Sequence, residues 1–140
     1  MLKGDLGTEL PLRWLVAFED VLAVLPQRLL RSAAKHTREG RWERLCACYE
    51  VVPGSRDRLW DLAWRRGLRV DVVSFTLSPL AEPALRDWIE RHNLPVCDVM
   101  FANADELAQY LAHLVDVQAV VHALDRPHVF GPRGVHVEKW

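Results

Sequence analysis

Side chains suited to proton transfer or anion binding follow three apolar segments of this chain. Glu19 and Asp20 come directly after the first of these segments, and Asp125 comes shortly after the last. Carboxylates can transfer protons or bind a divalent cation. Ser74 and Thr76 lie at the end of another apolar segment. Their hydroxyls can hydrogen-bond a phosphoryl oxygen or cap nearby backbone groups.

The elements that would position these side chains are strands alternating with helices. Five apolar segments predict buried strands: Trp14–Phe18, Val70–Phe75, Val96–Phe101, Gln118–His122 and Gly134–Val137. Three amphipathic segments predict helices: Ser55–Gly67 with Ser55 as N-cap, Pro79–His92 and Asp105–Leu114. This alternation predicts the α/β class, as a three-layer, Rossmann-like fold with a mainly parallel central sheet of about five strands.

Ligands bind such a sheet outside the carboxyl ends of its strands. The rule selects residues 17–20, 74–76, 101–103 and 122–125 as one candidate site.

Residues 18–52, between the first two strands, predict a small flap or helical insert. Val21–Lys35 has helix-like apolar spacing that Pro26 interrupts, so the proline either begins a second helix or kinks the first. Trp42–Val52 alternates in polarity and predicts a strand or an extended flap.

The order of these segments resembles the haloacid dehalogenase-like (HAD) hydrolase superfamily. Its first motif, Asp-x-Asp-x-(Thr/Val)-Leu, ends the first strand, where this chain has Ala17 and Glu19 in place of the two acids. The resemblance implies a nucleophile at the first position and a general acid–base at the second. Alanine can neither attack phosphorus nor ligate magnesium. Glu19 can still move a proton, Asp20 is one residue out of register, and both acids also suit a helix N-terminus.

The other family motifs are kept in part. Ser74 matches the hydroxyl of the second motif, and Thr76 is a weaker alternative. The third motif is a lysine, but Phe101–Asp105 contains no Lys or Arg, and Asn103 can only hydrogen-bond.

The fourth motif supplies acids that hold magnesium. His122 and Ala123 stand where those acids are expected, and Asp125 is a displaced candidate for a metal ligand.

The resemblance therefore implies a catalytically inactive pseudo-phosphatase that acts as a binding or assembly module and needs no cofactor. The alternative is an active phosphohydrolase that uses Asp20 or Glu19 with Ser74, Asp125 and Mg²⁺. A third reading is a metal-independent site for a small anion, with Ser74 and Thr76 as ligand-binding residues.

Other metal-binding patterns are weak. Cys46-x-Cys48 with a distant Cys97 lacks the paired spacing of a structural zinc site, so half-buried packing is the simpler reading. Three histidines near the C-terminus, at 122, 128 and 136, would bind a transition metal only if they converged.

Trp60 and Trp64 are spaced i, i+4 on a predicted helix, partly off its aliphatic stripe. Two neighbouring indoles on an outer face predict a surface for a protein partner or for self-association. A wide buried stripe beneath another helix is the alternative.

Composition limits the remaining possibilities. A length of 140 residues predicts one domain, 1–140, with a loose lead-in over 1–11. A net charge of −1 argues against nucleic acid and anionic membranes as partners. The residues after Met1 predict no signal peptide, and the sequence contains no apolar run of the roughly 18 residues that span a membrane. With three cysteines, an odd number, these features predict a cytoplasmic protein.

Overall fold

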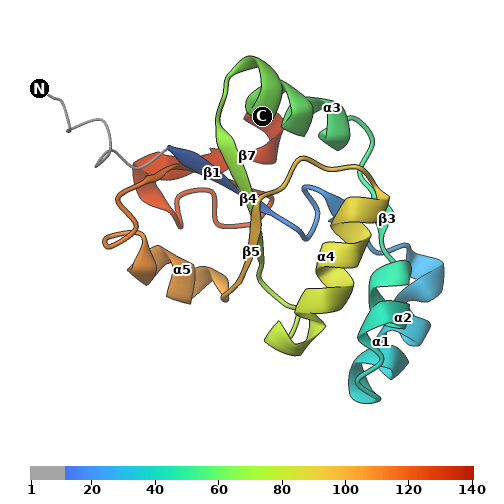
Figure 1. The fold of residues 1–140 in the computed structure, drawn as a ribbon. Helices are drawn as coiled ribbons and strands as arrows, with labels where there is room; N and C mark the ends of the chain where they lie inside the picture. Colours follow the sequence, from blue (N-terminus) through green and yellow to red (C-terminus); the bar gives the residue numbers. More distant parts are fainter. Residues whose placement is uncertain (1–11) are drawn as a thin grey trace, which may run out of the picture.

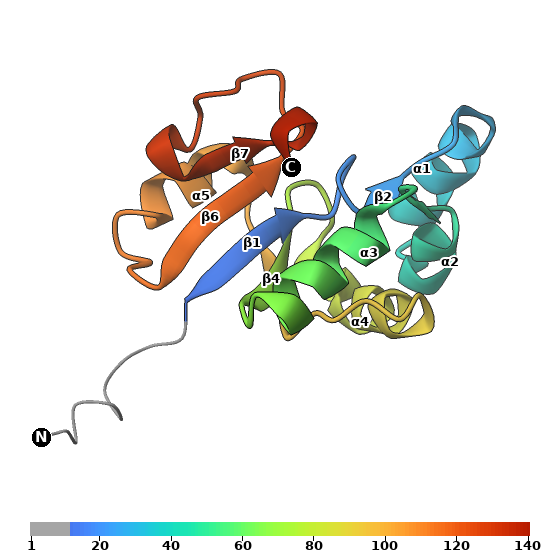
Figure 2. The ribbon, with the colours of Figure 1, turned by 90° about the horizontal axis from the view of Figure 1, so that it is seen from above.

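The computed structural model describes residues 12–140, so the predicted lead-in over 1–11 lies outside the described residues. A five-stranded, wholly parallel sheet with the order β5-β4-β1-β6-β7 forms the centre of the fold (Figures 1 and 2). Its strands are β1 (Arg13–Ala17), β4 (Arg69–Ser74), β5 (Asp98–Phe101), β6 (Val117–His122) and β7 (Gly134–His136). All five predicted strands are therefore confirmed, with small shifts at their ends.

Helices cover both faces of this sheet, which makes the expected Rossmann-like α/β arrangement (Figure 1). The helices α3 (Ser55–Trp60) and α4 (Glu82–Arg91) lie on one face, and α5 (Ala104–Tyr110) lies on the other. The order of the strands explains this division. The chain moves outward from β1 to β4 to β5 and then returns past β1 to β6, so right-handed crossovers place the last helix on the opposite face.

The central strands are apolar throughout because both of their faces are buried. Val16 and Val72 pack in the core beneath α3 and α4, whereas Leu15 and Val73 pack in the core beneath α5. The buried side chains of α4 include Leu85 and Trp88, as the helical spacing predicted. Alternating side chains of one strand thus belong to two separate cores.

Residues 18–52 form the insert between β1 and β4, and the prediction for this region was partly wrong. The strands β2 (Ala23–Val24) and β3 (Glu50–Val51) pair antiparallel, and the chain that connects them contains α1 (Leu30–Arg38) and α2 (Trp42–Ala47) (Figures 1 and 2). Val21–Val24 is therefore not helical. Pro26 instead precedes the 3-10 turn η2 (Gln27–Leu29) that leads into α1.

The alternation over Trp42–Val52 misled the prediction in its first half. This half is the helix α2, in which Leu45 and Cys46 are buried, and only Glu50 and Val51 pair as a strand. Six residues are too few for a helical period to be distinguished from an alternating one by apolar spacing.

The helix after β3 also differs in detail from its prediction. Its N-cap is Gly54, which has the left-handed φ of 84° that glycine tolerates, and the Ser55 hydroxyl donates to the carbonyl of Val52 at 2.7 Å. Beyond Trp60 the helix continues as the π-helical turn η3 (Asp61–Arg65).

At the amino end of the sheet, a buried carboxylate joins the central strands. Asp71, only 1% exposed, accepts from Arg13 at 2.9 Å and from Arg69 at 3.1 Å. Arg13 also pairs with Asp116, at 2.9 Å, just before β6. No helix within residues 12–140 is long and apolar enough to cross a membrane.

Candidate functional site

The carboxyl ends of the parallel strands bring three of the predicted site residues to one edge. β1 ends at Ala17, β4 ends at Ser74 and β6 ends at His122. β1 pairs with β4 on one side and with β6 on the other, so Ala17 lies between the other two strand ends. The turn after Ala17 then places Glu19 over the end of β4.

The Glu19 carboxylate is bound by the loop that follows β4. One oxygen accepts from the Ser74 hydroxyl at 2.6 Å, from the Thr76 hydroxyl at 2.7 Å and from the Thr76 backbone N–H at 3.2 Å. The other oxygen accepts from the Phe75 backbone N–H at 2.9 Å. Two hydroxyls and two backbone amides thus surround one internal anion.

This arrangement changes the predicted role of Ser74 and Thr76. They form an anion site, but the anion is the side chain of Glu19. The Ser74 oxygen also accepts from the Leu77 N–H at 3.1 Å, which fixes the hydroxyl further. An external phosphate would have to displace a carboxylate that is already held by charge-assisted hydrogen bonds.

Ala17, where the resemblance predicted a nucleophile, is sealed from solvent. Ala17 and the neighbouring Phe18 are both 0% exposed, and so is His122 across the sheet. A ligand could touch neither Ala17 nor His122 without movement of the surrounding side chains.

His122 is held as a neutral imidazole in an apolar environment. Its Nδ1 accepts from the Leu124 N–H at 3.2 Å, so a neutral ring carries its proton on Nε2, which has no hydrogen-bond partner among the described residues. The ring packs edge-on against Phe130 and His136, with centroids 5.1 and 5.5 Å apart. Burial, with a further contribution from His136, lowers the pKa of His122 below its usual value of 6.5.

The remaining candidates lie at the margin of this edge. Asn103 is the N-cap of α5, in a capping box with Glu106: each side chain accepts from the backbone N–H of the other residue. Asp20 is exposed and has a left-handed φ of 67°, and Asp125 is exposed in the loop after β6. Arg126, for which the sequence predicts no role, pairs with Asp105 at 3.0 Å near the same edge.

The donor set does not fit magnesium. The ion prefers several oxygen ligands in a nearly octahedral array. Both oxygens of Glu19 are already hydrogen-bonded, and within residues 12–140 no three His, Cys, Asp or Glu side chains converge in a way that could hold a metal ion. The three cysteines and the histidines at 122, 128 and 136 are among these residues, and neither set converges into a metal site within residues 12–140.

Cys46 and Cys48 are buried packing residues. Burial, with a contribution from Cys48, raises the pKa of the Cys46 thiol to about 11, and burial also raises the pKa of Cys48. Few thiolates form at such sites at neutral pH, so neither cysteine is suited to nucleophilic chemistry.

An apolar cavity of about 520 Å³ separates the insert from the loop after β4. Two hydroxyls in its lining are already engaged: Thr76 donates to Glu19, and Thr37 donates to the carbonyl of Ala33 at 2.9 Å. Tyr49 also lines the cavity, and burial, aided by the charge of Glu19, raises its pKa to about 12. The tyrosine is therefore neutral at physiological pH.

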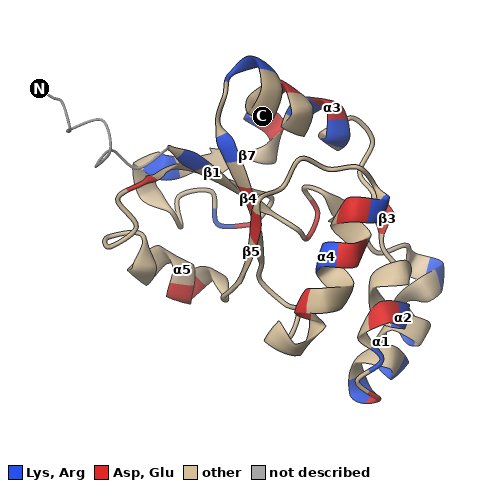
Figure 3. Cartoon of the chain, in the orientation of Figure 1, with Lys and Arg blue, Asp and Glu red and all other residues tan. Residues whose placement is uncertain are grey.

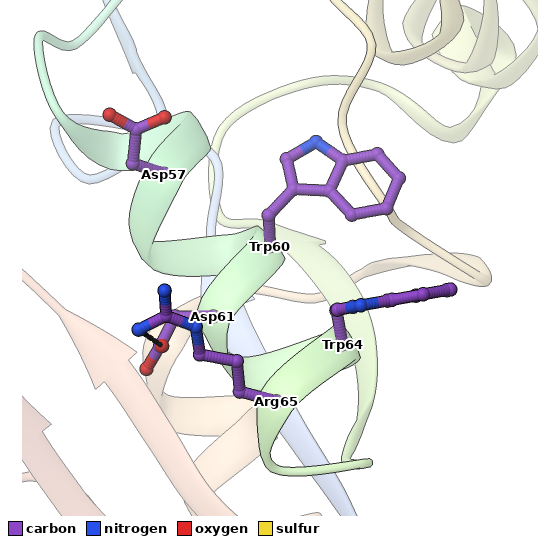
Figure 4. A pocket seen from close by; sticks show the side chains of 5 residues that line it. All are labelled: Asp57, Trp60, Asp61, Trp64 and Arg65. Atoms are coloured by element: carbon purple, nitrogen blue, oxygen red, sulfur yellow. Dashed lines mark ion pairs between the residues drawn. The ribbon is translucent and has the colours of Figure 1, made fainter.

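The predicted tryptophan surface is exposed and lies away from this edge. Trp64 is 81% exposed and Trp60 is 37% exposed, on the outer side of α3 and η3 (Figure 4). The alternative of a wide buried stripe is therefore wrong.

Comparison with known proteins adds no assignment. No protein-family model, curated protein or solved structure matches this chain.

Proposed function

We propose that this chain is a catalytically inactive, HAD-like pseudo-phosphatase that serves as a binding or assembly module. The observation that carries the proposal is the state of the two motif positions after β1. The first is a buried methyl group, Ala17, and the second is a carboxylate, Glu19, that is hydrogen-bonded to the loop after β4. Neither is available for attack on phosphorus.

The architecture supports the resemblance on which this proposal rests. An insert bounded by the antiparallel pair β2–β3 follows the first strand, and a hydroxyl residue, Ser74, ends the next parallel strand of the sheet. The role as a module is supported by the two exposed indoles of Trp60 and Trp64, because aromatic anchors dominate the energetics of protein interfaces.

The test is an assay with a generic phosphate ester, p-nitrophenyl phosphate, with and without Mg²⁺. We expect no turnover above the uncatalysed rate in either condition. Turnover that depends on Mg²⁺ and disappears in Asp20→Asn would overturn the proposal in favour of an active phosphohydrolase. Asp87→Asn, which changes an exposed acid on α4, is the matched control for that variant.

A further inference from the structure

The outer side of α3 and η3 carries two parallel rows of side chains. One row contains Trp60 and Trp64, and the other contains Asp57, Asp61 and Arg65 (Figure 4). Together these five residues line an open cavity of about 600 Å³. Figure 3 shows acidic and basic residues side by side on this part of the chain.

Trp60 and Trp64 differ from the other tryptophans that border this helix. An arginine covers the ring of Trp14, with Arg66 at 5.2 Å from the centroid, and the ring of Trp140, with Arg58 at 5.7 Å. No such cation lies over Trp60 or Trp64 among the described residues, although Trp64 is 81% exposed. Exposed aromatic surface of this size, unshielded, is typical of an interface.

One of the two indoles is held in place before any partner arrives. The Trp60 Nε1–H donates to the carbonyl of Asn93 at 2.9 Å, which links the end of α3 to the turn after α4. A fixed aromatic anchor loses little conformational entropy on association. A π-helical turn is also a feature found frequently at functional sites, and Trp64 lies in one.

The order of charges along the helix fits a second copy of the chain. Asp57 lies at the amino end of the face and Arg65 at its carboxyl end, with the tryptophans between them. Rotating a second copy by 180° about an axis through the middle of this face sets its Arg65 against Asp57 and its indoles against Trp60 and Trp64. The pattern is self-complementary, as a two-fold interface requires.

We propose that this face joins two copies of the chain in a two-fold symmetric dimer, with their α3–η3 helices antiparallel. The inference specifies the assembly part of the proposed function and rests on it. Asp61 lies close to the symmetry axis, where two copies of its carboxylate approach each other. Arg65, 3.5 Å from Asp61 within each chain, offsets their repulsion.

Sedimentation equilibrium of the full chain over a concentration series tests the dimer. We expect a reversible monomer–dimer equilibrium that Trp64→Ala weakens at least about tenfold. Because Trp64 is largely exposed, its loss should leave the fold intact, which circular dichroism verifies. Tyr110→Ala, an exposed aromatic on α5, is the matched control and should leave the equilibrium unchanged.

Charge exchange tests the antiparallel arrangement. Asp57→Arg alone and Arg65→Asp alone each place like charges opposite one another, and both should weaken the dimer. The double variant restores opposite charges across the axis and should recover most of the loss. A monomer at every concentration would overturn the inference, and so would a double variant as weak as the sum of its parts.

The two proposals fail separately. A monomeric protein without phosphatase activity would remove the dimer and leave the pseudo-phosphatase assignment. A dimer that hydrolyses phosphate esters would do the reverse.

Discussion

Glu19 determines the chemistry of the strand edge through the partners that it holds. Its carboxylate accepts hydrogen bonds from the hydroxyl of Ser74, which is 1% exposed, and from two backbone amides. Without Glu19, these donors would be free to bind an external anion. The same side chain therefore stabilises the fold and blocks the site. These two effects can be separated by experiment.

Replacement of Glu19 by alanine should lower the free energy of unfolding by about 2 kcal/mol, because a buried hydroxyl and backbone amides lose a charged acceptor. Urea denaturation measures this loss, and Glu90→Ala, an exposed acid on α4, serves as the control. Phosphate at millimolar concentration should then stabilise Glu19→Ala more than the unchanged protein. Equal stabilisation of both proteins would show that Glu19 does not occupy an anion site.

His122 should make stability depend on pH. Its pKa is lowered in the folded protein, so the unfolded chain binds the proton more readily. The contribution of His122 is therefore complete above its unfolded pKa, near 6.5, and is lost as the pH falls through the folded value. In His122→Gln, the difference in unfolding free energy between pH 7.5 and pH 5 should become smaller.

His92 provides the comparison for that experiment. Burial, together with the charges of Arg56 and Arg91, also lowers its pKa, so it contributes with the same sign. His92→Gln should remove a separate part of the pH dependence, and the two changes should add. A pH dependence left intact in His122→Gln would contradict the role given to the buried ring.

The sequence does not predict the hydrogen bond between Ser74 and Glu19, although it predicts both residues as part of the site. They are 55 residues apart, and only the pairing of β1 with β4 brings them together. The sequence indicated which side chains reach the edge of the sheet. It could not indicate that two of them bind each other, since each could equally have bound a ligand.

At the scale of elements, Asn103, a predicted site residue, stabilises a helix by capping the amino end of α5. Asn103→Ala should lower the free energy of unfolding by about 1 kcal/mol, because α5 loses its N-cap. Thermal denaturation measures the change. Asn103→Asp keeps a capping oxygen and should recover most of the stability, whereas a loss of equal size in both variants would argue against capping.

The sequence predicted the strands better than the insert, and the reason is physical. Strands such as β4 and β6 are buried on both faces, so their apolar character is continuous and unambiguous. The elements of the insert are short, between two and nine residues, and are stabilised mainly by packing against one another and α4. Local patterns such as that of Trp42–Ala47 therefore carry little information about them.

At the scale of the whole molecule, the two edges of the sheet differ in how their charges are used. The amino edge is tied by Asp71, which is paired with Arg13 and Arg69, and Arg13 extends the connection to Asp116 before β6. This cluster spans the three central strands. At the carboxyl edge, by contrast, the carboxylate of Glu19 is held by neutral hydroxyl and amide donors and not by arginines.

Asp71→Ala should lower the free energy of unfolding by about 3 kcal/mol, because Arg13 keeps a largely buried charge after losing a partner. Denaturant titration measures the effect. Asp98→Ala, which removes a half-exposed acid that pairs with Arg69 and Arg86, should cost less. Similar losses in the two variants would mean that burial of Asp71 has no special importance.

The burial of Ala17 beside a restrained Glu19 bears on how such a chain could change over generations. An aspartate placed at position 17 would meet a closed interior and a neighbouring carboxylate that is already hydrogen-bonded to the loop after β4. Under the proposed function, hydrolysis would therefore return only through several replacements made together. Selection would then act on the surface that binds a partner and not on turnover.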